Sequence, residues 1–352
     1  MKTALTERLG CQYPIVQTAM GWVADPALVA ATANAGGFGF LAGAVMTLEE
    51  IEAGILEIKR LTDKPFGVNF HMYVPHAEQI IDLCIEHKVR AVSYSRSPSS
   101  AAVKRLKDAG VLCMPTVGAL KHAIKAVEFG ADIVVVQGGE GGGHTGSVAT
   151  SILLKQVCQA VDVPVVAAGG FSRGSDLIAA LAQGACGIAM GTRFLLTQES
   201  PVPEVTKAEY LKAPPEQIIT STKLDGLPQR MILNPLLARL EKASGLQMLL
   251  LAIKNGLAFT KLTGVSLFGM LRSAMAMQKN TDLTLGQTMM AANAPMMIQE
   301  AMVKGHPRDG ILPSGQVAGL IDELPTVQAL IERLMAEADQ TLTRLNALNS
   351  SE

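Results

Sequence analysis

The sequence predicts an α/β fold, a (β/α)8 TIM barrel with a helical insertion, or lid, near its C-terminal end. Eight short apolar runs, helical patterns between them, and glycine turns after the last three runs lead to this prediction. With 352 residues, 49% of them hydrophobic, the chain can fill one large core. A doubly wound sheet more usually has five or six strands and glycines after the first strand. The position of the glycines therefore favours the barrel.

The eight predicted strands are continuously apolar rather than alternating, as expected of parallel strands that are covered on both faces. They are Pro14–Gln17, Gly37–Ala42, Phe66–Phe70, Ala91–Ser95, Val111–Thr116, Asp132–Gln137, Val163–Ala168 and Gly187–Met190. The helical patterns between them include Pro26–Ala35, Thr47–Leu61, His76–His87, Ser100–Ala109, Ala119–Phe129 and Gly174–Gln183. Gly110, Gly130 and Gly184 provide helix stops.

The rhythm of strands and helices breaks after about residue 200. Residues 201–307 begin with a charged, turn-rich stretch and continue with helical patterns, which predicts a helical subdomain that covers the substrate. Residues 1–200 and about 308–352 are expected to form the barrel and its closing helix. That helix is predicted over Leu324–Asn349, with Pro325 near its start.

The composition argues against several classes of protein. A formal net charge of −1 and an aromatic content of 4% are unlike a nucleic-acid-binding protein. Five widely spaced cysteines without a CxxC pair favour neither a disulfide framework nor a zinc site, so no metal is expected. The N-terminus lacks the apolar core of a signal peptide, and Leu246–Leu262 is interrupted by Lys254 and Asn255. We expect a soluble, cytoplasmic protein without a membrane span.

Two glycine turns predict a phosphate site. In a barrel of this kind the chemistry lies at the C-terminal ends of the strands. Ala168, Gly169 and Gly170 end the seventh strand, and Gly191 and Thr192 follow the eighth. Backbone N–H groups in such turns, beside a helix N-terminus, suit a phosphate monoester. The alternative interpretation is two ordinary tight turns.

The loop after the sixth strand carries the strongest signal for catalysis. It has six glycines in the ten residues 137–146, so its backbone can lie against a flat ligand. His144 emerges from this loop and can act as an acid or base near neutral pH. A lone histidine is more often structural, but this position favours a functional role. The GK[ST] of a phosphate-binding Walker loop is absent.

Two further strand ends supply candidates of lower specificity. Asn69 and His71 end the third strand, and Ala19, Met20 and Gly21 follow the first. Asn69 could equally cap the next loop, and His71 could simply support the wall of the site. These alternatives stay open at the level of the sequence.

The motifs GGEGGGHTG, VVAAGGF, GIAMGTRFL and GVNF, with SGQVAG near the end, resemble those of the nitronate monooxygenase (2-nitropropane dioxygenase-like) family. This resemblance covers residues 1–200 and 314–319. It implies an FMN-dependent barrel and an oxidoreductase, in a family that also holds flavin enoyl reductases and NADH:quinone reductases. It implies His144 as the catalytic residue.

The resemblance also implies a set of cofactor-binding residues at the strand ends. They are Ala19, Met20, Gly21, Asn69, His71, Thr116, Gln137, Gly142, Ala168, Gly169, Gly170, Gly191 and Thr192. The chain departs from the family where QTAM replaces the usual QAPM, and where Thr116 replaces a lysine or other polar residue. The second change alters the electrostatics expected around the flavin pyrimidine.

A longer string, residues 167–204, and the later LDGLPQRM resemble a branch of the family that acts on coenzyme A thioesters of steroid ring fragments. Eight of the 17 methionines also fall between residues 270 and 302. They are Met270, Met275, Met277, Met289, Met290, Met296, Met297 and Met302. Methionine suits a bulky apolar ligand, and Arg230, Lys254, Lys261 and Arg272 could meet its phosphates. The alternative is that these methionines fill a helical core.

These features are compatible with three functions. The first is flavin-dependent oxidation of a nitronate with His144 as acid or base. The second is a carbon–carbon dehydrogenase or enoyl reductase for an acyl-CoA thioester, and the third is a non-redox phosphate-binding barrel. The first is preferred, and the third ranks last because no barrel-end lysine or carboxylate pair is visible. The sequence leaves open dioxygen or NAD(P)H as redox partner, and a homodimer.

Overall fold

The structure is a computed structural model that describes residues 1–72, 76–95, 98–243 and 285–349. The chain forms two compact units. The barrel unit contains residues 1–141, 145–201 and 317–352, and the insert unit contains residues 142–144 and 202–316.

The barrel unit is built on one parallel sheet of nine strands, in the order β5-β4-β3-β2-β1-β10-β9-β7-β6. The strands are β1 (Ile15–Gln17), β2 (Phe38–Leu41), β3 (Gly67–His71), β4 (Ala91–Ser95), β5 (Leu112–Cys113), β6 (Thr116–Val117), β7 (Val134–Gln137), β9 (Val165–Ala168) and β10 (Gly187–Met190). All eight predicted strands are present, each within three residues of its predicted bounds except the fifth.

The fifth predicted strand is divided into β5 and β6, which stand at the two ends of the sheet order. Cys113 pairs with Val92 of β4, whereas Thr116 pairs with Val135 of β7. Only Met114 and Pro115 separate the two pieces, and the Pro115 carbonyl accepts a hydrogen bond from Val135 N at 2.9 Å. One short stretch of chain thus joins both ends of the sheet and closes the predicted barrel.

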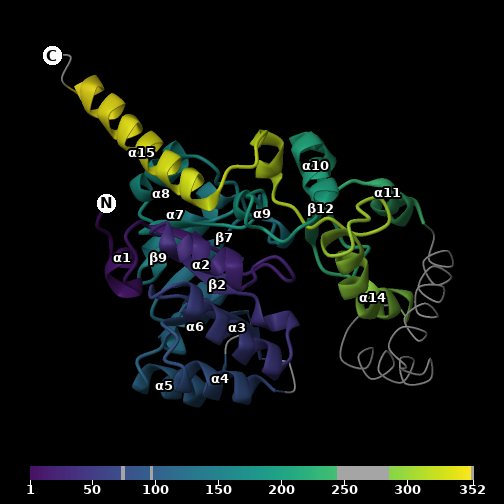
Figure 1. Ribbon diagram of the computed structural model, residues 1–352. Helices are drawn as coiled ribbons and strands as arrows, with labels where there is room; N and C mark the ends of the chain where they lie inside the picture. Colours follow the sequence, from purple (N-terminus) through teal and green to yellow (C-terminus); the bar gives the residue numbers. More distant parts are fainter. Residues whose placement is uncertain (73–75, 96–97, 244–284, 350–352) are drawn as a thin grey trace. The chain divides into compact units, whose positions relative to one another are not determined.

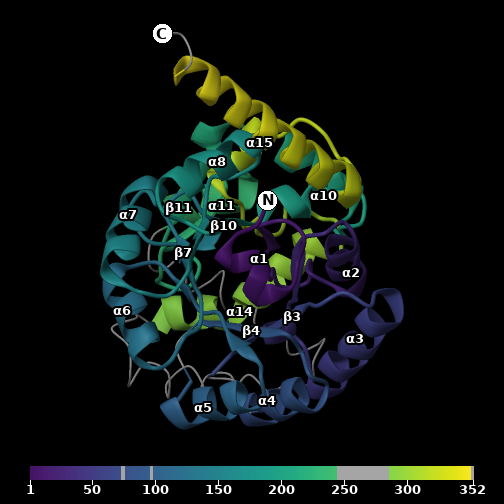
Figure 2. The ribbon, with the colours of Figure 1, turned by 90° about the vertical axis from the view of Figure 1, so that its left-hand side faces the viewer.

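Helices surround these strands, as Figures 1 and 2 show. In the barrel unit they are α1 (Ala4–Leu9), α2 (Pro26–Asn34), α3 (Leu48–Leu61), α4 (Ala77–Glu86), α5 (Ser100–Asp108), α6 (Leu120–Glu128), α7 (Thr150–Ala160), α8 (Gly174–Ala182), α9 (Thr192–Leu195) and α15 (Val327–Asn349), with the 3-10 helix η1 (Gly43–Val45). Another 3-10 helix, η3 (Gln316–Leu320), lies at the boundary of the units. Common capping residues mark the starts of several of these helices. Helix α3, for example, begins with a capping box between Thr47 and Glu50.

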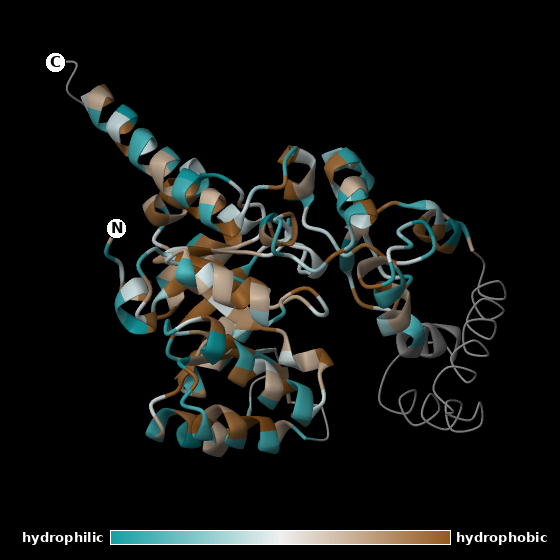
Figure 3. Ribbon diagram, in the orientation of Figure 1, coloured by the Kyte–Doolittle hydropathy of each residue, from teal (hydrophilic) through white to brown (hydrophobic). Residues whose placement is uncertain are grey.

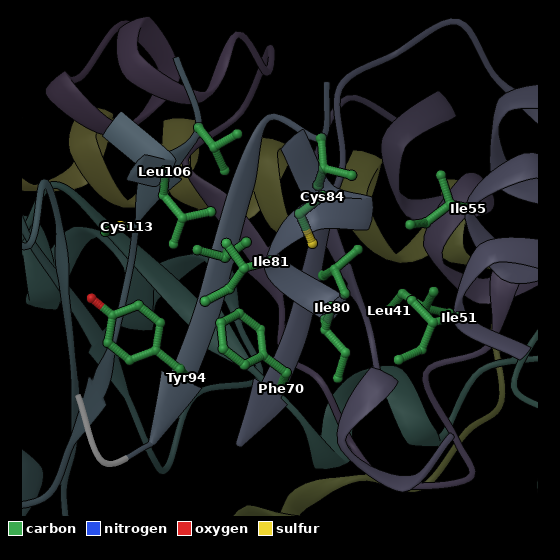
Figure 4. Packing of buried hydrophobic residues seen from close by; sticks show 14 of the residues in the cluster. Leu41, Ile51, Ile55, Phe70, Ile80, Ile81, Cys84, Tyr94, Leu106 and Cys113 are labelled. Atoms are coloured by element: carbon green, nitrogen blue, oxygen red, sulfur yellow. The ribbon is translucent and has the colours of Figure 1, made fainter. Parts of the chain in front are cut away.

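Apolar packing on the outside of the sheet joins β3 and β4 to the helices that cover them (Figure 4). Ile51 and Ile55 of α3 and Ile80 and Ile81 of α4 are fully buried there. Each such side chain contributes about 1.5–3 kcal/mol of hydrophobic stabilisation relative to exposure. The same helices carry hydrophilic residues elsewhere on their surface (Figure 3), which is the amphipathic pattern that the sequence predicts.

A second apolar cluster fills the inside of the barrel. Val16, Phe38, Val166 and other strand residues pack there with Leu5 and Leu9 of α1. The Leu5 side chain lies against Gly187, the first residue of β10. Helix α1 therefore closes the N-terminal end of the barrel, and the site is expected at the opposite end.

The C-terminal helix packs against α8 and α2 of the same unit (Figure 2). Gly174, the first residue of α8, lies so close to the backbone of Leu334 and Ala338 that a Cβ atom there would overlap it. Glu337 accepts a hydrogen bond from Gly174 N at 2.8 Å. The predicted closing helix is confirmed, and a glycine permits its contact with α8.

The insert unit contains α10 (Glu204–Lys212), η2 (Pro215–Gln217), β11 (Ile218–Ser221), β12 (Gln229–Ile232), α11 (Pro235–Lys242) and α14 (Leu285–Met302). An antiparallel sheet, β11-β12-β8, adds the two-residue strand β8 (Gly143–His144). This sheet is not predicted from the sequence, which shows only helical patterns here. Among the described helices of the chain, none combines the length and apolarity needed to cross a membrane.

Candidate active site

The predicted strand-end residues of the barrel unit lie on β3, β1, β10, β9, β7 and β6, or directly after them. Apart from Ala168, which is buried, all of them are half-buried. Since the strands are parallel and form a closed sheet, their C-terminal ends meet at one end of the barrel. The barrel fold thus gathers these residues, while Gly142 and His144 belong to the insert unit.

The turn after β9 has the backbone geometry that an anion site requires. Gly169 and Gly170 have φ angles of +99° and +88°, which residues with a side chain rarely adopt. Within the described chain, the N–H groups of Gly169, Gly170 and Gly191 donate to no protein acceptor. Strands β9 and β10 are adjacent and pair Ala168 with Ala189, so the two glycine turns follow the ends of neighbouring strands. These three donors could bind a phosphate group.

The start of helix α8 is not part of this donor set. The Ser172 and Arg173 N–H groups both donate to Asp176 Oδ2 at 2.8 Å, and Gly174 N–H donates to Glu337. The first amides of α8 are therefore already satisfied by carboxylates. A phosphate would be held by the glycine amides that precede the helix rather than by its N-terminus.

Residues after β1 lie beside the turn that follows β10. Thr18 N donates to Met190 O at 3.1 Å. A Cβ atom on Gly191 would lie 3.1 Å from Thr18 Oγ1 and 3.3 Å from Met20 Sδ. Met20 therefore lies beside the turn that contains Gly191. Ala19 packs against the cluster inside the barrel, and Gly21 lies against Val45.

The remaining barrel candidates differ in depth. Asn69 donates to Ser93 O at 3.1 Å, so its amide ties β3 to β4. Gln137 pairs with Ala168 at the strand ends, whereas Thr116 pairs with Val135, two residues before Gln137. Thr116 therefore lies lower in the barrel wall. His71 is half-buried at the last position of β3.

The glycines of the loop after β7 are needed for protein packing. A side chain on Gly138 would overlap Thr150, and a Cβ atom on Gly141 would lie 2.6 Å from Gln137 Nε2. Glu140 Oε2 accepts hydrogen bonds from Thr150 N and Oγ1 at 2.8 and 2.7 Å, so its carboxylate binds at the start of α7. The first part of the loop is therefore a compact turn held on α7.

The next three residues leave that turn and join the insert unit. His144 pairs with Gln229, and Gly143 with Arg230, in an antiparallel ladder with β12. Gly142 approaches the backbone of Ser314 and Gly315 so closely that a Cβ atom would lie 2.6 Å from Gly315 N. Gly143 has a φ angle of +66°. Glycine is thus required at residues 142 and 143 to seat His144 on the insert sheet.

His144 lies within hydrogen-bonding distance of Asp225, at 2.7 Å between Nε2 and Oδ2. The imidazole is 59% exposed, whereas the carboxylate side chain is 15% exposed. Burial acts to raise the pKa of Asp225, but hydrogen bonds from His144, Leu227 N and Gln229 outweigh it, and the pKa lies below its usual value. Asp225 is therefore ionised at neutral pH.

Asp225 and Gln229 were not predicted as site residues. Both lie in the LDGLPQRM motif, which was noted for its resemblance to one branch of the family. The motif was the available signal, but its contact with His144 depends on a pairing across 81 residues of sequence.

The structure answers part of the question about the methionines. Met297 and Met302 are buried in the insert unit, and Tyr210 OH donates to Met302 Sδ at 3.4 Å. These two fill a core, as the alternative interpretation holds, while Met296 is half-buried. Arg230 donates to Ile218 O at 2.8 Å. The other predicted lining residues have side chains outside the described part: Met270, Met275, Met277, Met289, Met290, Lys254, Lys261 and Arg272.

The barrel unit, with open glycine amides at the C-terminal ends of its strands, has the features of a (β/α)8-barrel enzyme. The family model for nitronate monooxygenase matches residues 2–80 and 73–337. The chain belongs to this family and is an oxidoreductase.

Two relatives match over almost their whole length. A (3aS,4S,5R,7aS)-5-hydroxy-7a-methyl-1-oxo-octahydro-1H-indene-4-carboxyl-CoA dehydrogenase from Rhodococcus jostii is 49% identical over 99% of both chains. The protein of the same name from Mycobacterium tuberculosis is 45% identical, again over 99% of both chains. Among solved structures, FabK from Thermotoga maritima matches with a TM-score of 0.80 and 30% identity over 99% of both chains. The resemblance stated from the sequence is confirmed at the level of the family.

Proposed function

We propose that the chain is an FMN-dependent dehydrogenase of a coenzyme A thioester whose acyl group carries a fused ring system. The observation that carries this proposal is the similarity to two dehydrogenases named for such a thioester, at 49% and 45% identity over 99% of the chain. The sequence alone placed nitronate oxidation first. Similarity along the entire chain, the insert included, now favours the thioester.

FMN is supported by the donor set at the barrel end. The amides of Gly169, Gly170 and Gly191 are open and lie in neighbouring turns, which fits a terminal phosphate. Ala19, Met20, Gly21, Asn69, His71, Thr116, Gln137, Ala168 and Thr192, with Gly142 of the insert unit, are proposed to contact the rest of the cofactor. FMN, when bound, supplies a hydride acceptor.

His144 is proposed as the acid–base residue of this reaction. Dehydrogenation removes a hydride and a proton from the substrate, and the proton needs a basic side chain as its acceptor. An exposed imidazole on a two-residue strand that is held by backbone pairing offers such a group. The half-buried residues after β1 and β10 would shield the hydride-accepting region from water.

Oxidation of a nitronate remains the second candidate function because the matching family model is that of nitronate monooxygenase. The two substrates are distinguished by anaerobic titration of the purified protein. We expect a bicyclic acyl-CoA to bleach the flavin absorbance at lower concentration than propyl-2-nitronate does. Free coenzyme A and the free carboxylic acid are the matched controls and should not bleach it.

The same sample identifies the cofactor and its oxidant. Mass spectrometry of the released flavin should show FMN, and stoichiometric FAD would refute the phosphate assignment. Reoxidation by dioxygen, by NAD(P)⁺ or by a quinone, followed at the flavin band, would identify the electron acceptor. Efficient reduction by nitronate with no response to any acyl-CoA would overturn the proposed substrate.

A further inference from the structure

The carboxylate of Asp225 is held in place by contacts other than the one with His144. It lies in the turn between β11 and β12, where Leu227 N donates to its Oδ1 at 3.0 Å. Gly226 adopts a φ angle of +82° and donates from its backbone N–H to Thr222 O. This is a turn closed by its own aspartate, which is a common way to fix a carboxylate at a chain reversal.

Gln229 holds the other oxygen and lies on the same face as His144. Its Nε2 donates to Asp225 Oδ2 at 2.6 Å. Gln229 and His144 are directly opposed in the β8–β12 ladder, and opposed residues of an antiparallel pair project to one side. The pairing register thus delivers the imidazole to a carboxylate that already has two other donors.

An ionised carboxylate can only accept hydrogen bonds. In the pair with Asp225, His144 Nε2 must therefore carry the proton. In the neutral imidazole the lone pair then resides on Nδ1.

We propose that Asp225 is the positioning residue of His144: with Gln229, it orients the imidazole and fixes its Nε2–H tautomer. The role in turnover rests on the function proposed above for His144. The tautomer does not rest on it. The two parts are therefore tested separately.

The tautomer is read directly from ¹⁵N chemical shifts after selective labelling of the histidines. The chain has six histidines, and the His144 signals are assigned by their loss in His144→Ala. In the wild-type protein with its flavin bound we expect the neutral His144 ring to carry its proton on Nε2 and none on Nδ1. A His144 that carries its proton on Nδ1 would overturn the assignment, whatever the substrate of the enzyme is.

The effect on catalysis is tested with Asp225→Asn, which keeps the shape of the side chain and removes its charge. The amide can donate to Nε2 and so favour the opposite tautomer. We expect flavin reduction by the substrate to slow by about 100- to 10,000-fold, in the range known for a misoriented or wrongly protonated general base. Flavin content should stay at the wild-type level, and Asp225→Glu should recover part of the rate.

A matched control is present in the same unit. Glu300 pairs with His306 at 2.6 Å between Oε1 and Nδ1, and this pair is remote in sequence from His144. Glu300→Gln removes an equivalent carboxylate–imidazole interaction, and we expect the rate of flavin reduction to remain unchanged. Equal losses of rate in both variants, or full activity in Asp225→Asn, would overturn the positioning role. If no acyl-CoA reduces the flavin, the proposed substrate fails, and the ¹⁵N measurement still decides between the tautomers.

Discussion

Replacing Gly170 by alanine should weaken cofactor binding far more than it weakens the fold. Gly170 has a φ angle of +88°, and the nearest atoms to a Cβ placed there are carbons of Glu140, at 3.5 and 3.9 Å. The added methyl group therefore meets no steric barrier within the protein. It would be added to a residue whose own open amide is proposed to bind the phosphate.

Gly110 provides a matched substitution away from the site. It ends α5 with a φ angle of +80°, and a Cβ atom there meets no atom within 4 Å. An alanine in the left-handed region costs about 1–2 kcal/mol at either position. We therefore expect Gly170→Ala and Gly110→Ala to lower the free energy of unfolding of the apoprotein by similar amounts.

Only Gly170→Ala should change the affinity for FMN. A hydrogen bond from a backbone amide to a charged phosphate oxygen contributes about 1.5–3 kcal/mol. Loss of one such bond raises the Kd by about 10- to 150-fold, since about 1.4 kcal/mol corresponds to a factor of ten. Quenching of FMN fluorescence during titration of each apoprotein measures the Kd, and thermal unfolding measures the strain. Equal Kd values for the two variants would show that the β9 turn does not bind the phosphate.

Three further predictions follow from the same structure. His144→Ala should retain FMN but lower turnover by about 100- to 10,000-fold. A variant that loses flavin but keeps full activity per bound FMN would show that His144 has a structural role instead. Gly174→Ala should displace α15 from α8 because a methyl group would overlap the backbone of Leu334 and Ala338. We expect the free energy of unfolding to fall by about 1–3 kcal/mol or more, and proteolysis of the last helix to become faster. An unchanged digestion pattern would contradict this prediction. Hydrogen bonds from His306 and Lys304 hold the pKa of Glu300 in the folded protein below its usual value. The ionised carboxylate therefore stabilises the fold at every pH above the pKa of the unfolded chain. This contribution is lost as the pH falls through the pKa of the folded protein. Glu300→Gln should therefore lower the thermal midpoint at pH 7, and the difference from wild type should disappear only as the pH falls through the lowered folded pKa of Glu300. A difference that stays constant with pH would refute the linkage.

The eight-strand barrel was predictable because each strand is a short apolar run between glycine or helix-stop residues. The exception is the fifth strand, predicted as Val111–Thr116 and found as two pieces. Pro115 has no N–H group to donate, so the ladder is interrupted there and the chain passes from one neighbour to the other. Continuous apolar patterning cannot reveal that interruption, although the proline itself marks it.

The antiparallel sheet of the insert was not predictable by the same means. Strands β11 and β12 have four residues each, and β8 has two. Periodicity needs a longer window to distinguish such segments from helix or loop. The pairing also joins residues 229–230 to residues 143–144, and no local pattern encodes a contact across that separation.

His144 and Asp225 show the same limit at the site itself. The glycine loop singles out His144, since residues 142 and 143 need glycine to reach their positions. Asp225 stands before a glycine in LDGLP, where an aspartate has an ordinary role in the turn, and the structure shows that role as well. Its contact with His144 follows only from the pairing register of β8 and β12. His144 is consequently held by the insert sheet, so substitutions at Asp225 or Gln229 should alter proton transfer without altering the open amides of Gly169, Gly170 and Gly191.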